Sequence, residues 1–450
     1  MNRKFDLIAI GTGSAASAVT SRCNAAGWQV AIIDSRSFGG TCALRGCDPK
    51  KVLIGAADVT DWARRMQGKG IKTEQLKIDW QELMRFKRSF TEPVPKHREE
   101  GFAKAGIAAF HGRARFVGPS TVQVGDEVLD GRYVVIAAGQ KPADLKISGV
   151  EHLTTSEQFL ELDELPSRIL FIGGGYIAFE FAHVALRAGS QVTIVHRGAR
   201  PLPLFDPDLV DQLVEATREL GADIQLGTEA VGIEKNSGGL TVRASTSGQE
   251  RIFEADLVVH AAGREPEIDD LNLDAAGVEW DKRGVKINGF LQSVSNPAVY
   301  AAGDAAASKG APLTPVAAYE GMIVAKNLLK GNRQKPNYLG IPTVVFTIPP
   351  LASVGLSERK AREQDLKFTV KKEMTSDWYA SRRIAETYSG YKVLVEEETD
   401  HILGAHLLGS GAEEVINLFA VAMRSGMRAS DLKHMIFAYP THGSDLPYML

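Results

Sequence analysis

Cysteine is scarce in this chain, and no long apolar run interrupts it. Only Cys23, Cys42 and Cys47 occur among 450 residues, which excludes a secreted scaffold held together by disulfides. No uncharged apolar stretch approaches the ~18 residues that a membrane-spanning helix needs. No apolar segment with a small-residue cleavage site follows the N-terminal residues, so we expect no secretory signal. The cytoplasm is therefore the expected location, where a cysteine pair is redox-active or metal-binding more often than structural.

Charge of either sign is not in excess. The formal net charge is −3, and 44% of the residues are hydrophobic and 24% charged, as in ordinary soluble proteins. This near-neutral balance gives no reason to expect a nucleic acid or an anionic membrane as partner. The length predicts two to four domains. Glycine is in excess, because 44 of the 450 residues are glycine and this exceeds its usual share of ~7%.

Two segments repeat one pattern, in which an apolar strand is followed by a glycine-rich turn, a helix and a second strand. The first segment contains Leu7–Ile10, Gly11-Thr12-Gly13-Ser14-Ala15-Ala16 and Val30–Ile33. The second contains Ile169–Ile172, Gly173-Gly174-Gly175-Tyr176-Ile177-Ala178 and Val192–Val195. Each has the motif G-x-G-x-x-A in the strand–turn–helix context that dinucleotide binding requires. One bare motif is as often a plain glycine turn, but two copies with matched strands are not.

The turns predict where two dinucleotides bind. Glycines let the backbone approach a pyrophosphate, and the following helix offers unpaired N–H groups and a partial positive charge. A late strand and turn follow each repeat, ending at Ala138-Gly139 and at Ala262-Gly263. The residues expected at the first site are Gly11, Gly13, Ser14, Ala15, Ala16, Ala138 and Gly139, and those at the second are Gly173, Gly175, Tyr176, Ile177, Ala262 and Gly263. Two such sites predict an enzyme that passes electrons between two dinucleotides.

The residue that ends the second strand of each repeat distinguishes the two dinucleotides. Asp34 lies 23 positions after Gly11, and the same step from Gly173 reaches His196. A carboxylate at this point accepts the ribose 2′-OH of FAD or NAD and repels a 2′-phosphate. The second repeat instead continues with Arg197 and Arg200, which can pair with a 2′-phosphate unless they are simply solvated loop charges. We therefore assign FAD to the first site and NADPH to the second.

Cys42 and Cys47 form a C-x4-C pair shortly after Asp34. This is not zinc spacing, no second Cys/His pair accompanies it, and we predict no metal site. Pro49 indicates that a helix begins near Cys47. The helix N-terminus, with Arg45 and the two lysines that follow Pro49, is expected to lower a thiol pKa. Cys23 is expected to be a buried, inert thiol.

The segment Gly39–Lys51 resembles the redox-disulfide signature of the class I pyridine nucleotide–disulfide oxidoreductases. That family includes glutathione reductase, dihydrolipoamide dehydrogenase and mercuric reductase. Further matches to its motifs are Val299–Asp304, Leu313–Ala317, Ile341–Phe346 and Ser353–Leu356, so the resemblance covers nearly the whole chain. It implies an α/β fold with two Rossmann-like domains and a C-terminal α+β dimerisation domain. The implied divisions are 1–145 and 265–330 for FAD, 146–264 for NADPH and 331–450 for the homodimer interface.

The resemblance also implies roles for individual residues. Cys47 would be the flavin-proximal thiol that forms the charge-transfer complex, and Cys42 the interchange thiol that attacks the acceptor. Lys50 or Lys51, depending on helix phase, would pair with Glu180 near the flavin. Tyr176 would gate the nicotinamide pocket, although a packed helix-face aromatic is an alternative. Further residues expected at FAD are Gly40, Thr41, Ala114, Asp304, Leu313, Thr314 and Ala317.

The chain departs from the family near its C-terminus and between its cysteines. The family's His-Pro-Thr-x-x-Glu motif, whose histidine shuttles protons across the dimer, has Tyr439 and Ser444 at the histidine and glutamate positions. A phenol is a poor base at neutral pH, and His442 is either a substitute base or a packing residue. Arg45 and Asp48 replace apolar residues, where they could tune the thiols, contact a charged acceptor or pair with each other.

These features predict an NADPH-dependent flavoprotein that reduces a small-molecule or protein disulfide through Cys42 and Cys47. A metal-ion reductase of the mercuric type is the alternative enzyme. Mercuric reductases resemble this chain in having a tyrosine at the position of Tyr439, but their C-terminal vicinal cysteines are missing here. A redox sensor that keeps FAD and the dithiol without turnover is the alternative from another class.

Overall fold

The computed structural model describes residues 3–450, which form two compact units. The first unit contains the residues up to Pro49 together with Phe86–Ala143 and Arg264–Tyr338. The second contains Lys50–Arg85, Asp144–Gly263 and Leu339–Leu450. Helices α3 (Cys47–Arg65) and α4 (Trp80–Thr91) have residues in both units. The predicted division into two dinucleotide domains and an interface domain, with boundaries near 145, 264 and 330, stays a prediction.

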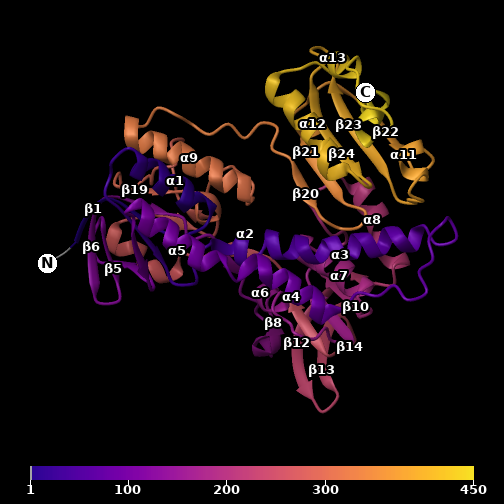
Figure 1. The fold of residues 1–450 in the computed structure, drawn as a ribbon, viewed down its shortest axis with the longest axis horizontal. Coiled ribbons are helices and arrows are strands. Elements are labelled where there is room, and N and C mark those ends of the chain that lie inside the picture. Colours follow the sequence, from indigo (N-terminus) through magenta and orange to yellow (C-terminus); the bar gives the residue numbers. More distant parts are fainter. Residues whose placement is uncertain (1–2) are drawn as a thin grey trace. The chain divides into compact units, whose positions relative to one another are not determined.

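The first unit is built on a mostly parallel sheet with the strand order β3-β2-β1-β6-β5-β4, and β19 pairs with β6 (Figure 1). Its strands are β1 (Arg3–Ile10), β2 (Val30–Asp34), β3 (Ala108–His111), β4 (Ala114–Phe116), β5 (Thr121–Val124), β6 (Glu127–Ile136) and β19 (Val299–Ala301). Only β4 and β5 join the sheet in antiparallel fashion. Strands β1 and β6 bury apolar side chains on both faces, as strands covered on both sides do.

Helices and short ribbons complete the first unit. The helices are α1 (Ser14–Ala25), α2 (Gly40–Arg45), α5 (Val94–Ala105) and α9 (Thr314–Lys330), with 3-10 turns at Asp269–Leu271, Leu273–Ala276 and Gly303–Ala305. The ribbons pair β7 (Gln140–Pro142) with β16 (Arg264–Pro266) and β17 (Trp280–Asp281) with β18 (Gly284–Val285). Helices α1 and α9 approach closely at Gly321, which has no side chain. A Cβ there would lie only 2.4 Å from the Ala15 carbonyl oxygen.

The second unit contains another parallel sheet, with the order β11-β10-β9-β15-β8. Its strands are β8 (Leu153–Thr154), β9 (Arg168–Ile172), β10 (Gln191–His196), β11 (Asp223–Leu226) and β15 (Leu257–His260). A meander of β12 (Thr228–Asn236), β13 (Gly239–Thr246) and β14 (Gln249–Ala255) packs on one face through apolar side chains. The helices are α6 (Ser156–Phe159), α7 (Tyr176–Arg187) and α8 (Pro207–Glu219), with a 3-10 turn at Val150–His152.

The glycine turns are the same in the two parallel sheets. Gly11 follows β1 with a φ of +104°, and a Cβ there would lie 2.3 Å from the Ala137 carbonyl oxygen. Gly173 follows β9 with a φ of +123°, and a Cβ there would lie 2.1 Å from the Ala261 carbonyl oxygen. No residue with a side chain fits either position. The repeat predicted from the sequence is therefore confirmed as a repeat of structure.

An antiparallel sheet forms the C-terminal part of the second unit, with the order β20-β21-β24-β23-β22. Its strands are β20 (Thr343–Val345), β21 (Leu351–Gly355), β22 (Phe368–Met374), β23 (Gly390–Glu396) and β24 (Ile402–Leu408). Its helices are α10 (Glu358–Glu363), α11 (Tyr379–Arg382), α12 (Ala412–Ser425), α13 (Ala429–Lys433) and α14 (Leu446–Met449), with a 3-10 turn at His442–Asp445. Helix α12 packs its apolar face on β21 and β24.

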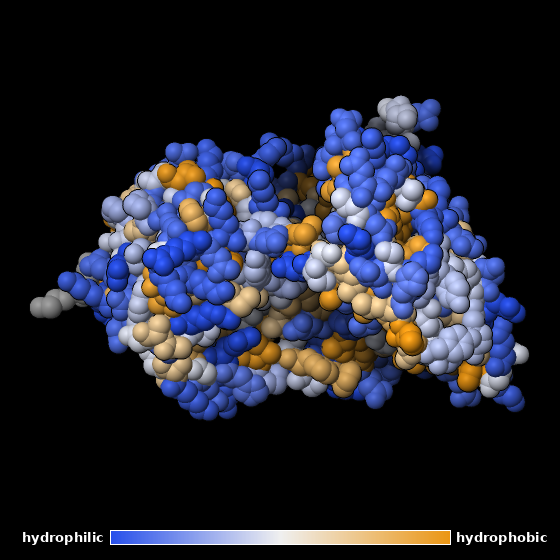
Figure 2. All heavy atoms as spheres, turned by 90° about the horizontal axis from the view of Figure 1, so that it is seen from above, coloured by the Kyte–Doolittle hydropathy of each residue, from blue (hydrophilic) through white to orange (hydrophobic). Residues whose placement is uncertain are grey.

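Surface character agrees with the composition. The face drawn in Figure 2 is mostly hydrophilic, with hydrophobic side chains in scattered groups. Within residues 3–450, no helix is both long enough and apolar enough to cross a bilayer.

Candidate active site

Two helix N-termini meet at the first glycine turn. Helix α1 begins directly after Gly13, and α2 begins at Gly40, where a Cβ would lie only 2.5 Å from the Gly13 Cα. A Cβ on Gly13 itself would meet nothing closer than 3.9 Å, so the space in front of α1 is open. Ser14, Ala15 and Ala16 form the first turn of α1. N–H groups of two helix ends beside open space are suited to a pyrophosphate.

Asp34 is fixed at the end of β2, on the edge of the sheet where Gly11 begins its turn. Its Oδ2 accepts hydrogen bonds from the Thr12 backbone N–H at 2.9 Å and the Thr12 hydroxyl at 2.6 Å. Its Oδ1 accepts one from the Arg36 backbone N–H at 2.9 Å. These bonds hold the carboxylate in a single orientation, while Oδ1 keeps one lone pair for a ribose hydroxyl. Thr12 was not predicted, although the hydroxyl inside the G-x-G motif was a visible signal.

Asp304 lies in the 3-10 turn that follows β19, and it is largely buried. Among residues 3–450 its carboxylate accepts no hydrogen bond, and burial raises its pKa to about 6 against the opposing charge of Arg264. Such an unsatisfied acceptor calls for a donor that the protein does not supply. A Cβ on the preceding Gly303 would lie 3.1 Å from the Ala317 Cβ and 3.5 Å from the Ala15 Cβ. The hydroxyl groups of a flavin's ribityl chain would satisfy Asp304, so these residues fit FAD.

The other residues predicted for FAD lie in the same unit. Ala138 and Gly139 follow β6, Leu313 caps the start of α9, and Ala114 is buried at the start of β4. Gly139 has a φ of +76° and open space in front of its Cα. Thr41 is in the first turn of α2.

The two thiols of the C-x4-C pair lie on consecutive helices. Cys42 is half-buried in α2, and Cys47 is exposed as the first residue of α3. Both are free thiols, and the Cys47 Sγ lies 3.4 Å from the hydroxyl of Thr314 at the start of α9. Cys23 is fully buried, and burial raises its pKa to about 12, as expected of an inert thiol.

The pKa of Cys42 is raised, whereas the helix start and its cations were expected to lower a thiol pKa. The hydrogen bond with Cys47 is the largest cause, followed by burial, and the Thr314 hydroxyl acts in the opposite direction. The negative charge of Asp48 adds to the rise, because its Oδ1 lies 3.7 Å from the Cys42 Sγ as a hydrogen-bond acceptor. Cys42 therefore stays protonated in the reduced pair, whereas the lowered thiol pKa was expected at the helix that begins near Cys47.

The second unit pairs a lysine of α3 with a glutamate of α7. Lys50 is buried, and its Nζ forms an ion pair with Oε2 of Glu180, which is 1% exposed. The Phe346 backbone N–H donates to Oε1 of Glu180 at 2.7 Å. Lys51 instead places its Nζ 4.0 Å from the Phe346 ring centroid. Of the two lysines left open by the sequence, Lys50 is the partner of Glu180.

The second glycine turn resembles the first and is also open. Helix α7 begins at Tyr176 after Gly175, where a Cβ would meet nothing closer than 3.9 Å, and Ala262 and Gly263 follow β15. Ile177 is buried against the sheet, while the Tyr176 ring is 46% exposed and lies 4.8 Å from the Lys50 Nζ. An open glycine turn at a helix start fits the pyrophosphate of a pyridine nucleotide.

The two arginines predicted for a 2′-phosphate have different surroundings. Arg200 donates two hydrogen bonds, each of 2.7 Å, to the carboxylate of Asp211, which raises the Arg200 pKa. Arg197 is exposed, and within residues 3–450 it makes no hydrogen bond or ion pair. His196 Nε2 donates to the Arg200 carbonyl oxygen at 3.1 Å, and burial lowers the His196 pKa. Arg197 is thus the cation free to meet a phosphate, while Arg200 would first have to leave Asp211.

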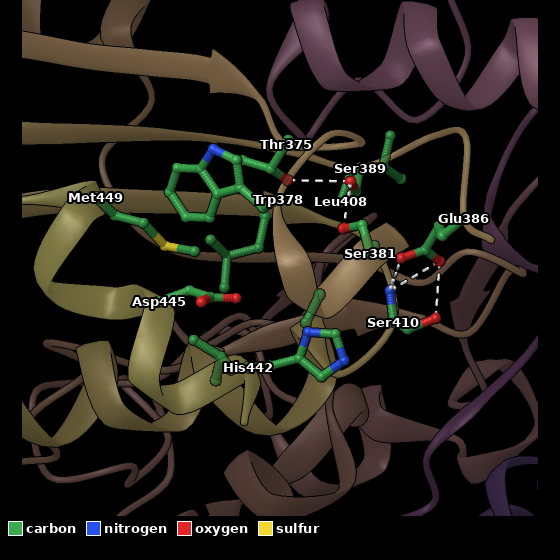
Figure 3. A pocket seen from close by; sticks show the side chains of 15 residues that line it. Thr375, Trp378, Ser381, Glu386, Ser389, Leu408, Ser410, His442, Asp445 and Met449 are labelled. Atoms are coloured by element: carbon green, nitrogen blue, oxygen red, sulfur yellow. Dashed lines mark hydrogen bonds between the residues drawn. The ribbon is translucent and has the colours of Figure 1, made fainter. Parts of the chain in front are cut away.

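The C-terminal residues predicted to replace the proton shuttle have different surroundings. Tyr439 is 79% exposed and stacks on Tyr379 with ring centroids 6.4 Å apart. His442 lines a pocket of about 40 Å³ together with Glu386 and Asp445 (Figure 3). Burial, then the charge of Arg383, lowers the His442 pKa. The lowered pKa makes His442 a weaker base, and its side chain is partly exposed, whereas that of Tyr439 is largely exposed.

The pocket of Figure 3 was not foreseen from the sequence. Glu386 accepts hydrogen bonds from the Ser410 backbone N–H and hydroxyl at 2.7–3.0 Å. Burial raises the pKa of Glu386, and it raises that of Asp445 to about 6. The residues come from loops far apart in sequence, and no motif linked them. Within residues 3–450 no group of three or more His, Cys, Asp or Glu side chains is arranged to hold a metal ion.

Comparison with known sequences identifies the family. The pattern described as "Pyridine nucleotide-disulphide oxidoreductase" matches residues 5–321, and that of its dimerisation domain matches residues 341–449. The chain belongs to this family. It is therefore a flavoprotein disulfide oxidoreductase that uses FAD and a pyridine nucleotide, and it carries the family's dimerisation domain.

Individual relatives differ in their acceptors. A mercuric reductase of Staphylococcus aureus is 33% identical over 98% of this chain and 81% of its own length. A glutathione reductase of Burkholderia cepacia is 32% identical over 97% of this chain and 96% of its own length. The solved copper(II) complex of the HOCl-induced flavoprotein disulfide reductase RclA from Escherichia coli superimposes with a TM-score of 0.88. It is 26% identical and covers 100% of this chain and 99% of its own.

Proposed function

We propose that this chain oxidises NADPH and reduces a disulfide acceptor through the Cys42–Cys47 pair. The observation that carries the proposal is the pair itself, two free thiols on consecutive helices with Cys47 against Thr314. FAD, when bound, supplies the two-electron relay between the nicotinamide and this pair. The open helix ends at Gly13 and the unsatisfied carboxylate of Asp304 support FAD binding in the same unit.

The two thiols take different parts in turnover. Two electrons open the Cys42–Cys47 disulfide and leave a thiol at Cys42 and a thiolate at Cys47. Cys42 gives up its proton as its sulfur attacks the acceptor disulfide, which forms a mixed disulfide and releases one half of the acceptor as a thiol. Cys47 then attacks the Cys42 sulfur, which releases the second thiol and restores the pair. The raised Cys42 pKa supports this division, because it leaves the negative charge of the reduced pair on Cys47. The Thr314 hydroxyl is placed to donate a hydrogen bond to that thiolate.

Lys50 and Glu180 are proposed to act at the flavin, as the family resemblance implies. Burial of both side chains makes their ion pair sensitive to any change of charge beside it. Tyr176, exposed at the start of α7, is proposed to cover the nicotinamide pocket until the coenzyme enters.

NADPH rather than NADH is proposed as the coenzyme. An exposed Arg197 without a partner supports it, because a guanidinium can form charge-assisted bonds with a 2′-phosphate. We expect Arg197→Ala to raise the KM for NADPH about tenfold or more and to leave that for NADH unchanged. Arg200→Ala is expected to have a smaller effect, because its charge is already neutralised by Asp211. Equal KM changes for the two coenzymes would contradict the assignment.

A soft metal ion is the second candidate acceptor. Tyr439 stands at the position of the family's proton-shuttling histidine, and relatives include mercuric reductases and a reductase solved with copper(II). The protein is also proposed to be a homodimer, which the dimerisation domain supports. The three-part domain division and a cytoplasmic location complete the proposal.

Anaerobic NADPH oxidation against a panel of acceptors tests the proposal. The panel contains glutathione disulfide, lipoamide, thioredoxin, Hg(II), Cu(II) and quinones. We expect multiple turnovers with a disulfide, a long-wavelength absorbance band on reduction, and loss of acceptor reduction in Cys42→Ser. Full activity of Cys42→Ser would refute the role of the pair. Turnover with metal ions alone would select the second candidate, and no turnover with any acceptor would favour a redox sensor.

A further inference from the structure

A carboxylate lies beside the thiol that meets the acceptor. Asp48 is the second residue of α3, it is exposed, and its Oδ1 lies 3.7 Å from the Cys42 Sγ. Cys42 is the interchange thiol of the proposed function, so an acceptor that reacts with its sulfur comes within a few ångströms of this charge. The other charges of the segment are Arg45, whose Nε is buried, Lys50, which pairs with Glu180, and Lys51, which lies over the Phe346 ring. Asp48 is the exposed charged group that is hydrogen-bonded to this sulfur.

We propose that Asp48 selects acceptors by charge, favouring cationic acceptors at Cys42 and disfavouring anionic ones. The shared chemistry is a positive charge next to the reacting atom, as in a disulfide flanked by ammonium groups or a soft metal cation. This inference rests on the proposed function, because it names the substrate class of the same site.

Electrostatics sets the size of the effect. A unit charge about 5–6 Å from an acceptor's charge, partly screened by water, changes the encounter roughly threefold to tenfold. The difference in interaction free energy between a cationic and an anionic acceptor is twice that between a charged and a neutral one. A role as proton acceptor fits less well, because a carboxylate is too weak a base to take a thiol proton at neutral pH. Asp48 therefore acts on the acceptor rather than on the proton.

Thiol labelling tests the charge effect without any turnover. In Cys47→Ser holoenzyme, Cys42 is the reactive thiol, since Cys23 is fully buried. The probes are methanethiosulfonates with a trimethylammonium group, a sulfonate group or no charge. The Cys42 thiolate attacks the probe's thiol sulfur, the S–S bond to the sulfonyl group breaks, and methanesulfinate leaves with the electron pair. The measured quantity is the ratio of the rate constants for the cationic and the anionic probe.

We expect Asp48→Asn to lower this ratio at least about fivefold, because it removes the charge and keeps the shape. The matched control is Asp126→Asn, which removes one negative charge from an exposed turn of the same unit and should leave the ratio unchanged. The effect of Asp48→Asn should shrink as salt rises, which a merely structural role would not produce. If the ratio of the two rate constants is the same in Cys47→Ser holoenzyme with and without Asp48→Asn, the proposal is overturned.

Turnover with charged disulfides separates this inference from the proposed function. The acceptors are cystamine, hydroxyethyl disulfide and 3,3′-dithiodipropionate, which are cationic, neutral and anionic. The proposed function predicts reduction of the neutral disulfide. The inference predicts that kcat/KM is highest for cystamine, lower for the neutral disulfide and lowest for the anionic one. It also predicts that these differences become smaller in Asp48→Asn. Reduction of all three with an unchanged order would refute the inference alone. Failure of all three would refute disulfide reduction, and the labelling ratio would then still decide the role of Asp48.

Discussion

The ion pair between Lys392 and Asp206 gives the strongest stability prediction. Lys392 in β23 is 2% exposed and Asp206, which precedes α8, is 0% exposed, with Nζ and Oδ2 2.8 Å apart. Asp206 also caps α8 by accepting from the backbone N–H groups of Asp208 and Leu209. Burial opposes the charge of Lys392, but its bonds to Asp206 and Asp208 outweigh burial and raise its pKa. Lys392 is therefore charged across the neutral range.

Lys392→Met leaves the carboxylate of Asp206 buried without its counter-charge. Breaking a buried pair in this way costs about 3–5 kcal/mol of folding free energy. For a unit of this size, that loss lowers the midpoint of thermal unfolding by roughly 6–15 °C, measured by calorimetry on the FAD-loaded protein. The double variant Lys392→Met/Asp206→Asn should regain most of the loss, because it contains no buried charge and asparagine still caps a helix.

A matched control is available on the neighbouring surface. Lys372 pairs with Asp208 at 3.0 Å but is 59% exposed, so Lys372→Met should cost at most about 1 kcal/mol. The reasoning is refuted if Lys392→Met melts with the wild type, or if the double variant is less stable than the single one. Either outcome would mean that the buried charge of Asp206 is solvated by a route that the structure does not show.

Two further predictions concern the candidate site. Lys50→Met should slow flavin reduction by NADPH about tenfold or more, because it leaves Glu180 buried without its cation, whereas Lys51→Met should change the rate less than twofold in stopped flow. Equal effects of the two variants would contradict the pairing. Asp304 has a folded pKa of about 6, above its unfolded value, so the folded apoprotein binds the extra proton. Apoprotein stability should therefore fall by roughly 2–3 kcal/mol as pH rises from about 4 to 6, and Asp304→Asn should abolish this dependence in chemical unfolding.

The fold was largely predictable because its turns leave the backbone little choice. Gly11 and Gly173 need a positive φ and a close carbonyl contact, and both requirements leave a sequence signal. The sheet at 390–408 and helix α12 also followed from apolar patterning. The sequence did not predict that Glu180 pairs with Lys50 rather than Lys51. Adjacent residues point 100° apart around a helix axis, and the sequence alone does not fix which of the two directions faces Glu180.

Charge contacts across loops could not be predicted. The pairing of Arg200 with Asp211 joins a turn to helix α8, and nothing in the local sequence indicates which side chains meet. The raised pKa of Cys42 could not be predicted for the same reason. Helix position and nearby cations were visible in the sequence, but the contacts of Cys42 with Cys47 and Asp48 depend on how α2 turns into α3. Local signals set the backbone, and tertiary contacts set the electrostatics.

Two departures from the family pattern, Tyr439 and Asp48, bear on one question, the chemistry of the acceptor. A disulfide acceptor releases a thiolate that must be protonated, which is the task of the histidine that Tyr439 replaces. A soft metal cation needs no such proton. As Cys42 and Cys47 close to a disulfide they release two electrons and the Cys42 proton, and one Hg(II) ion or two Cu(II) ions accept the two electrons. A negative charge 3.7 Å from the Cys42 sulfur disfavours anionic disulfides and attracts a cation. If acceptor preference follows these two residues, Cu(II) and cystamine will both be used. Only cystamine reduction will then slow as pH rises, because its leaving thiolate draws its proton from solvent.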